Sequence, residues 1–112
     1  MRAGAATDAA AAAVARLGEG AGVRACAVLD SGGELLAASA DNDWAAQAER
    51  IWDAAADPQR PAPAHVHVAT DGGEVFAVRG PAGAIIAVAD RFALASLMLC
   101  DLRAALRGLD RA

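Results

Sequence analysis

Two turns, each built from an aspartate and a Gly-Gly pair, constrain the fold of this chain more than any other sequence feature. The first is Asp30-Ser31-Gly32-Gly33 and the second is Asp71-Gly72-Gly73, and apolar runs flank both. Asp accepts local backbone hydrogen bonds and Gly tolerates a positive φ angle, so each turn predicts a β-hairpin. The strands predicted around these turns, with a fifth strand after the turn at residues 79–83, are residues 23–29, 34–39, 65–70, 74–79 and 84–89.

Helical patterns lie before, between and after these strands. The predicted element order is therefore αββαβββα, in a single α+β domain over residues 1–112. Thr7 and Asp8 are predicted to cap an alanine-rich first helix that ends near Leu17. The second helix is predicted to begin after a cap within residues 41–43, and the last helix after Asp90. The predicted core face of the last helix comprises Phe92, Ala95, Met98, Leu99, Leu102, Leu106 and Leu109.

The middle helix carries both tryptophans of the chain. Trp44, Ala48, Ile51 and Ala55 recur at helical spacing and form one apolar face. Trp52 lies about 80° around the helix from Trp44, so a single buried stripe does not cover both indoles fully. Trp is enriched at interface hot spots, and we expect at least one of the two to contact a partner. The alternative is that Trp44 and Ile51 are core residues that cover the sheet.

The stretch Gly22–Ser39 resembles the first hairpin of roadblock domains, in which an apolar strand, an Asp-x-x-Gly turn and a second strand ending in small residues follow one another. The strand Ala84–Asp90, running into Arg91–Leu109, is similar to the closing strand and helix of the same family. With the element order, the resemblance to this roadblock-longin superfamily covers nearly the whole chain. Longin and profilin-like domains share the topology.

The resemblance implies a five-stranded antiparallel sheet in the order 2-1-5-4-3, with the middle helix on one face and the two terminal helices on the other. Roadblock domains generally dimerise through the middle helix and the third strand, which joins two sheets into one. They include dynein light chains, Ragulator-type scaffolds and bacterial regulators of small Ras-like GTPases. The bacterial regulators act by reshaping the GTPase and do not donate an arginine finger. The type suggested here is the bacterial one, without catalytic residues.

These implications and the amphipathic middle helix define a candidate interface for a homodimer or for a small Ras-like GTPase. The candidate residues are Trp44, Gln47, Arg50, Ile51, Trp52, His65 and His67. Arg50 has the chemistry of an arginine finger, but a rigid helix surface is poorly shaped to enter a nucleotide site. We therefore expect Arg50 to bind and not to catalyse.

Composition excludes several other classes. The chain has ten arginines, no lysine and fourteen carboxylates, and its net charge of −4 argues against nucleic-acid binding. No apolar run approaches the length of a membrane span, and the N-terminus lacks the apolar core of a secretory signal. The abundance of alanine and the bias to arginine favour a GC-rich bacterial genome. We expect a cytoplasmic protein.

His65 and His67 are two residues apart on a predicted strand, so their side chains project from one face. Across a two-fold axis four imidazoles could gather and bind Zn²⁺ or titrate near neutral pH, but no Cys, Asp or Glu nearby in sequence completes a ligand set. We favour a half-exposed strand without a metal or cofactor.

Cys26 and Cys100 are expected to be buried structural thiols, although a disulfide or redox pair is the alternative.

The glycine-rich turns each join two strands, whereas a phosphate-binding loop joins a strand to a helix N-terminus. No set of side chains in the sequence predicts an enzyme. Arg24 and Arg79 lie on predicted strands, and the sequence does not decide whether they form charge pairs or face solvent. The favoured reading is a homodimeric module that regulates or scaffolds a partner such as a small Ras-like GTPase. The rival is a small-ligand sensor with a pocket between helix and sheet, which lacks convergent polar groups.

Overall fold

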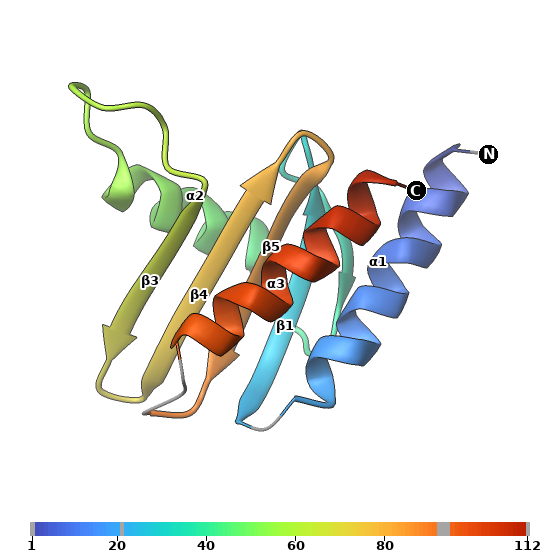
Figure 1. Cartoon of the computed structure of the whole chain (residues 1–112), viewed down its shortest axis with the longest axis horizontal. Helices are drawn as coiled ribbons and strands as arrows, with labels where there is room; N and C mark the ends of the chain where they lie inside the picture. The colour runs from blue at the N-terminus through green and yellow to red at the C-terminus, as the bar shows by residue number, and fades with distance from the viewer. Residues whose placement is uncertain (1, 21, 92–94, 112) are drawn as a thin grey trace.

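The computed structural model describes residues 2–20, 22–91 and 95–111. Helices cover both faces of one antiparallel sheet (Figure 1). In chain order the elements are α1 (Arg2–Gly18), β1 (Val23–Asp30), β2 (Leu35–Ala38), α2 (Trp44–Ala55), β3 (His65–Thr70), β4 (Gly73–Gly80), β5 (Gly83–Ala89) and α3 (Ala95–Asp110). The predicted element order αββαβββα is confirmed.

The five strands lie in the order β2-β1-β5-β4-β3, as the resemblance implies. The first and last strands in the chain, β1 and β5, are therefore neighbours, and their register pairs Cys26 with Ala87 and Val28 with Ile85. Residues 26–29 of β1 and 83–87 of β5 are buried. This burial confirms that the two most apolar predicted strands are central and covered on both faces.

Both predicted Asp/Gly turns form. In the first, Asp30 Oδ1 accepts the backbone N–H groups of Gly32 and Glu34 at 2.9 and 3.0 Å. Gly33 has a φ angle of 88°, which favours glycine there. In the second, Gly73 approaches the β5 backbone so closely that a Cβ atom there would clash with the carbonyl oxygen of Ala89. The glycines thus allow the tight turn in one hairpin and close strand packing in the other.

The helices divide between the two faces as predicted, with α1 and α3 on one face and α2 on the other (Figure 1). The core on the α1/α3 face is built around Phe76, Ile85 and Leu102, each fully buried. The smaller core under α2 contains Leu29, Trp44 and Ile86, which are at most 1% exposed. Alanines complete both cores, so helices approach the sheet closely and a few large side chains supply most of the buried area.

One predicted helix start differs in the structure. The first helix already begins at Arg2, so Thr7 and Asp8 are exposed residues within α1 and not its caps. Alanine has the highest helix propensity, and the alanine-rich segment before Thr7 continues the helix without a stop signal. The described part of α3 begins at Ala95, and Arg91 lies in a turn. The predicted core residue Phe92 lies outside the described residues.

The cap of the middle helix is as predicted. Asp43 precedes α2 and its Oδ1 accepts the backbone N–H of Ala46 at 3.2 Å. Asp90 is predicted to cap the last helix, but the backbone groups that this cap would bond lie outside the described residues. Its carboxylate accepts a hydrogen bond from Nε of Arg24 on β1. Arg24 therefore forms a charge pair, which the sequence left open. Within the described residues, no helix is both long and apolar enough to cross a membrane.

Candidate protein interaction surface

Trp44 anchors the beginning of α2 to the sheet. Its side chain is 1% exposed, and its indole Nε1 donates to the carbonyl oxygen of Ala40 at 2.9 Å. Ala48, one turn later, is also buried, whereas Ile51 and Ala55 are half-buried. The predicted apolar face is therefore the face that packs on the sheet, and its burial decreases toward the C-terminal end of the helix.

Trp52 leaves this face and packs against Arg79 of β4. The Arg79 guanidinium carbon lies 4.1 Å from the centroid of the Trp52 ring, a cation–π contact. Arg79 Nε donates to the carbonyl oxygen of Pro63 at 2.8 Å, and its backbone N–H donates to that of Ala64 at 2.9 Å. One arginine thus ties the end of α2 and the approach to β3 to the sheet, and it does not face solvent alone.

Gln47 and Arg50 lie on the opposite flank of α2 from Trp52. At 100° per residue, these two positions are rotated away from Trp44 in the sense opposite to Trp52. Gln47 is half-buried and Arg50 is exposed. In the described part of the chain Arg50 has no ion-pair partner, so its guanidinium is available on the surface of α2.

Below this flank, the sheet presents a row of apolar side chains that α2 leaves partly uncovered. The strand register aligns Ala25, Val88, Val75 and Val68 across β1, β5, β4 and β3. The first three are half-buried, and Val68 at the sheet edge is 40% exposed. We call these four residues the valine row. An apolar strip that runs to an open sheet edge is typical of an interaction surface.

The strand at this edge, β3, pairs only with β4 among the described strands. Its outer backbone N–H and C=O groups are therefore free to pair with another chain. Such an edge is long, since all six residues of β3 are in register with β4. The edge strand, the valine row and the outer flank of α2 together form one continuous candidate surface.

His65 and His67 do project from one face of β3, as predicted, but it is the face covered by α3. His67 stacks on the Phe76 ring at a centroid distance of 4.3 Å, and its Nε2 lies 2.7 Å from Glu74 Oε1. His65 Nδ1 lies 3.3 Å from a guanidinium nitrogen of Arg103 on α3. The structure therefore separates the candidate residues, with those of α2 on one face of the sheet and the histidines on the other.

No group of three or more His, Cys, Asp or Glu side chains converges to hold a metal in the described residues.

Cys26 is buried on β1, and burial raises the pKa of its thiol while the hydrogen bond with Ser39 opposes the shift. Cys100 is exposed on α3, so the expectation that both thiols are buried is wrong for it. Cys100 is rotated away from the core position Leu102 by roughly 160°, which directs it outward. Both cysteines are free.

Sequence reasoning missed two features, the contact that positions this surface and the exposure of the valine row. The clamp by Arg79 links residues far apart in the chain, and no local pattern predicts it. The valines of the row stand in apolar runs that predict strands, but those runs do not show which side chains stay uncovered. The area of the sheet that a short helix covers depends on where the helix packs. No sequence pattern therefore predicts which part of the sheet face stays exposed.

No model of a protein family matches the sequence, and no curated protein matches it either. Solved structures do match in three dimensions. The Roadblock/LC7 domain from Streptomyces avermitilis superposes with a TM-score of 0.74 at 14% identity, over 88% of this chain and 92% of that one. Myxococcus xanthus MglB superposes with a TM-score of 0.74 at 13% identity, over 94% of this chain and 87% of the other. Together with the strand order and the placement of the helices, these similarities establish that the chain has the roadblock/LC7 fold.

Proposed function

We propose that this chain is a non-catalytic, homodimeric interaction module that regulates or scaffolds a small Ras-like GTPase. The observation that carries the proposal is the continuous surface formed by the β3 edge, the valine row and α2. An open edge strand supplies backbone hydrogen bonds, and the adjoining apolar row supplies buried area. Dimerisation and GTPase regulation are what the resemblance to roadblock domains implies.

The shape of the molecule supports pairing through β3. The chain that follows α2 extends beyond the β3 edge at one end of the sheet (Figure 1). The valine row lies nearer the other end, because Val75 is close to the beginning of β4 and its partner Val88 is close to the end of β5. In an antiparallel β3–β3 pair, the two copies are related by a 180° rotation about an axis at the middle of β3. That rotation brings the overhanging segment of each copy beside the partly uncovered valine row of the other. In a closed two-fold interface of this kind, each copy buries the same surface against the other.

The same rotation would place the outer flanks of the two α2 helices on one face of a joined sheet. Gln47 and Arg50 lie on that flank, and the exposed Arg50 has no ion-pair partner in the described residues. We assign them to partner binding. A guanidinium on a rigid helix can recognise a carboxylate of the GTPase surface without entering its nucleotide site.

The test uses the small Ras-like GTPases of the organism that encodes this chain. Binding and GTP hydrolysis are measured with the wild-type protein, with Arg50→Ala and with Arg107→Ala, a matched arginine on α3 that is exposed on the opposite face. We expect nucleotide-dependent binding that Arg50→Ala weakens about tenfold, with any effect on hydrolysis falling in proportion, and no change for Arg107→Ala.

Two outcomes would contradict the proposal. If Arg50→Ala abolished stimulated hydrolysis while binding remained intact, Arg50 would be an arginine finger and the module would be catalytic. If the wild-type protein bound none of the host's small GTPases in either nucleotide state, the GTPase assignment would be wrong. The prediction of a dimer is tested separately, by light scattering.

A further inference from the structure

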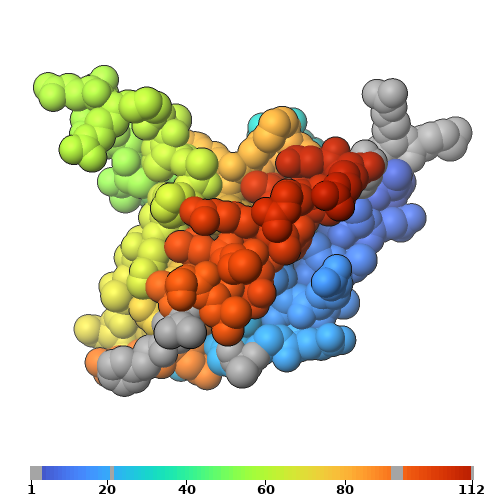
Figure 2. Space-filling model, viewed as in Figure 1, coloured from blue at the N-terminus to red at the C-terminus, as the bar shows by residue number. Residues whose placement is uncertain are grey.

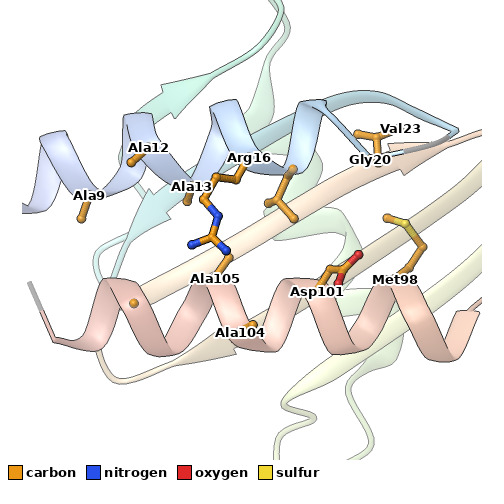
Figure 3. Close-up of a pocket in the computed structure, with 12 residues that line it drawn as sticks. Ala9, Ala12, Ala13, Arg16, Gly20, Val23, Met98, Asp101, Ala104 and Ala105 are labelled. Carbon is orange, nitrogen blue, oxygen red and sulfur yellow. The ribbon is translucent and has the colours of Figure 1, made fainter.

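A groove separates α1 from α3 on the face of the sheet opposite the valine row. Its volume is about 390 Å³, and its walls are the facing sides of the two helices (Figure 3). In the space-filling view, α3 and α1 lie side by side in front of the sheet (Figure 2). The residues that line the groove are Ala9, Ala12, Ala13, Arg16, Leu17, Gly20, Val23, Met98, Asp101, Ala104, Ala105 and Gly108.

The groove exists because small residues occupy the facing positions of both helices. Ala9, Ala12 and Ala13 line it from α1, and Ala104 and Gly108 from α3. Larger side chains at these positions would fill the space between two neighbouring helices. Ala12, Ala104 and Gly108 are exposed, so the groove is open to solvent along its length and does not enclose a ligand. Small-molecule pockets, in contrast, bury most of their ligand.

One charge of each sign lies in the groove. Arg16 reaches from α1 toward α3, and Asp101 projects from α3 toward α1 (Figure 3). Both residues are exposed, and within the described chain neither has an ion-pair partner. Two unpaired charges on opposite walls of an apolar groove complement an occupant that carries a carboxylate on one side and a basic group on the other.

An exposed leucine continues the apolar surface past the end of the groove. Leu97 is 55% exposed and lies one helical turn before Asp101, on the side of α3 that also carries Ala104 and Gly108. Residues 9–17 of α1 span about 12 Å, so groove and leucine together match two to three turns of a helix. Helices that meet through alanine and glycine approach to the short end of the usual interaxial distance, about 8 Å.

We propose that this groove binds one amphipathic helix of a partner protein. The contact face of that helix is apolar, with an acidic residue placed to pair with Arg16 and a basic residue placed to pair with Asp101. A second copy of this chain fits less well, because two concave surfaces placed face to face leave the space between them empty. The site is on the other face of the sheet from the surface proposed for dimerisation, so both can be occupied together.

In the test, the photoreactive residue p-benzoylphenylalanine replaces Leu97, where a large apolar side chain already stands. Cells of the native organism that express this variant are then irradiated to form cross-links. The cross-linked partner and segment are identified by mass spectrometry. We expect a segment with helical apolar periodicity flanked by charges of both signs. Ala12→Phe, which fills the groove, should reduce the cross-link at least tenfold. Ala15→Phe is the matched control, because Ala15 is exposed on α1 outside the groove.

A synthetic peptide with the sequence of the cross-linked segment then tests the charges by fluorescence anisotropy. Arg16→Glu should weaken its binding about tenfold, and exchanging the acidic residue of the peptide for lysine should restore it. The inference is overturned if the Leu97 cross-link is absent, persists in Ala12→Phe, or joins two copies of this chain, or if charge exchange does not restore binding. Light scattering and thermal unfolding of each variant check that dimerisation and folding are unchanged, so the outcome is independent of the proposed function.

Discussion

Arg79 holds Trp52 in place from the sheet, with its guanidinium carbon 4.1 Å from the centroid of the indole ring. The same side chain donates from Nε to the carbonyl oxygen of Pro63. The end of α2 and the approach to the edge strand β3 therefore depend on one residue of β4. Because both border the candidate interaction surface, Arg79 positions that surface without belonging to the contact itself.

Arg79→Ala should lower the free energy of unfolding by about 2–4 kcal/mol, since it removes a cation–π contact and a hydrogen bond from a charged donor. A double-mutant cycle with Trp52→Ala measures the coupling by denaturant unfolding. We expect coupling of about 0.5–2 kcal/mol between the two residues. Additive single losses would show that the ring and the guanidinium do not stabilise one another.

Trp44→Ala should destabilise the fold by about 3–5 kcal/mol, because it removes the largest side chain of the core under α2. Trp52→Ala should cost less stability and weaken association more, since Trp52 is only half-buried. Thermal unfolding and light scattering on both variants distinguish the two roles. Equal losses of stability with unchanged association would place both tryptophans in the core.

Val68→Lys should convert the expected dimer to a monomer at tens of micromolar. A lysine on this edge would bring two like charges close to the two-fold axis and would interrupt the apolar row. Leu35→Lys is the matched control, because Leu35 is 48% exposed on β2, the opposite edge of the sheet. Size exclusion with light scattering gives the answer, and a wild-type monomer at the same concentration would rule out the dimer.

Stability should decrease above about pH 8.5 in a way that depends on Cys26. Burial raises the pKa of this thiol in the folded state, whereas in the unfolded chain it ionises near its ordinary value of roughly 8.5. Only the unfolded state then loses a proton, and stability falls by at most about 1.4 kcal/mol per pH unit until the folded thiol ionises too. The difference in unfolding free energy between wild type and Cys26→Ala should therefore shrink from pH 7 to pH 10.

Cys100→Ala is the control for this measurement, since Cys100 is exposed on α3. Its difference from wild type should stay constant over the same pH range. A parallel decline in the wild-type and Cys26→Ala curves would mean that other groups cause the loss of stability at alkaline pH.

The order of the elements and both hairpins follow from the amino-acid sequence alone. Those features are local: Asp30 caps its own turn, Gly33 adopts a positive φ angle, and Asp43 caps the helix that follows it. The α1 start was predicted incorrectly because Thr7 and Asp8 have the side chains of caps, and alanine sustains the helix through them. Local preference decides a boundary only where a stop signal accompanies the cap.

Which residues meet depends on how the helices pack on the sheet. The sequence predicted that His65 and His67 share a face, but the placement of α3 put them beside Arg103 and Phe76, away from the tryptophans of α2. Likewise, the partial cover of the valine row and the contact of Arg79 with Trp52 depend on where α2 lies on the sheet. Secondary structure follows from short-range backbone and side-chain preferences. The exposed surface consists of the side chains that the packing of distant segments leaves uncovered. It therefore depends on the position of every helix and strand.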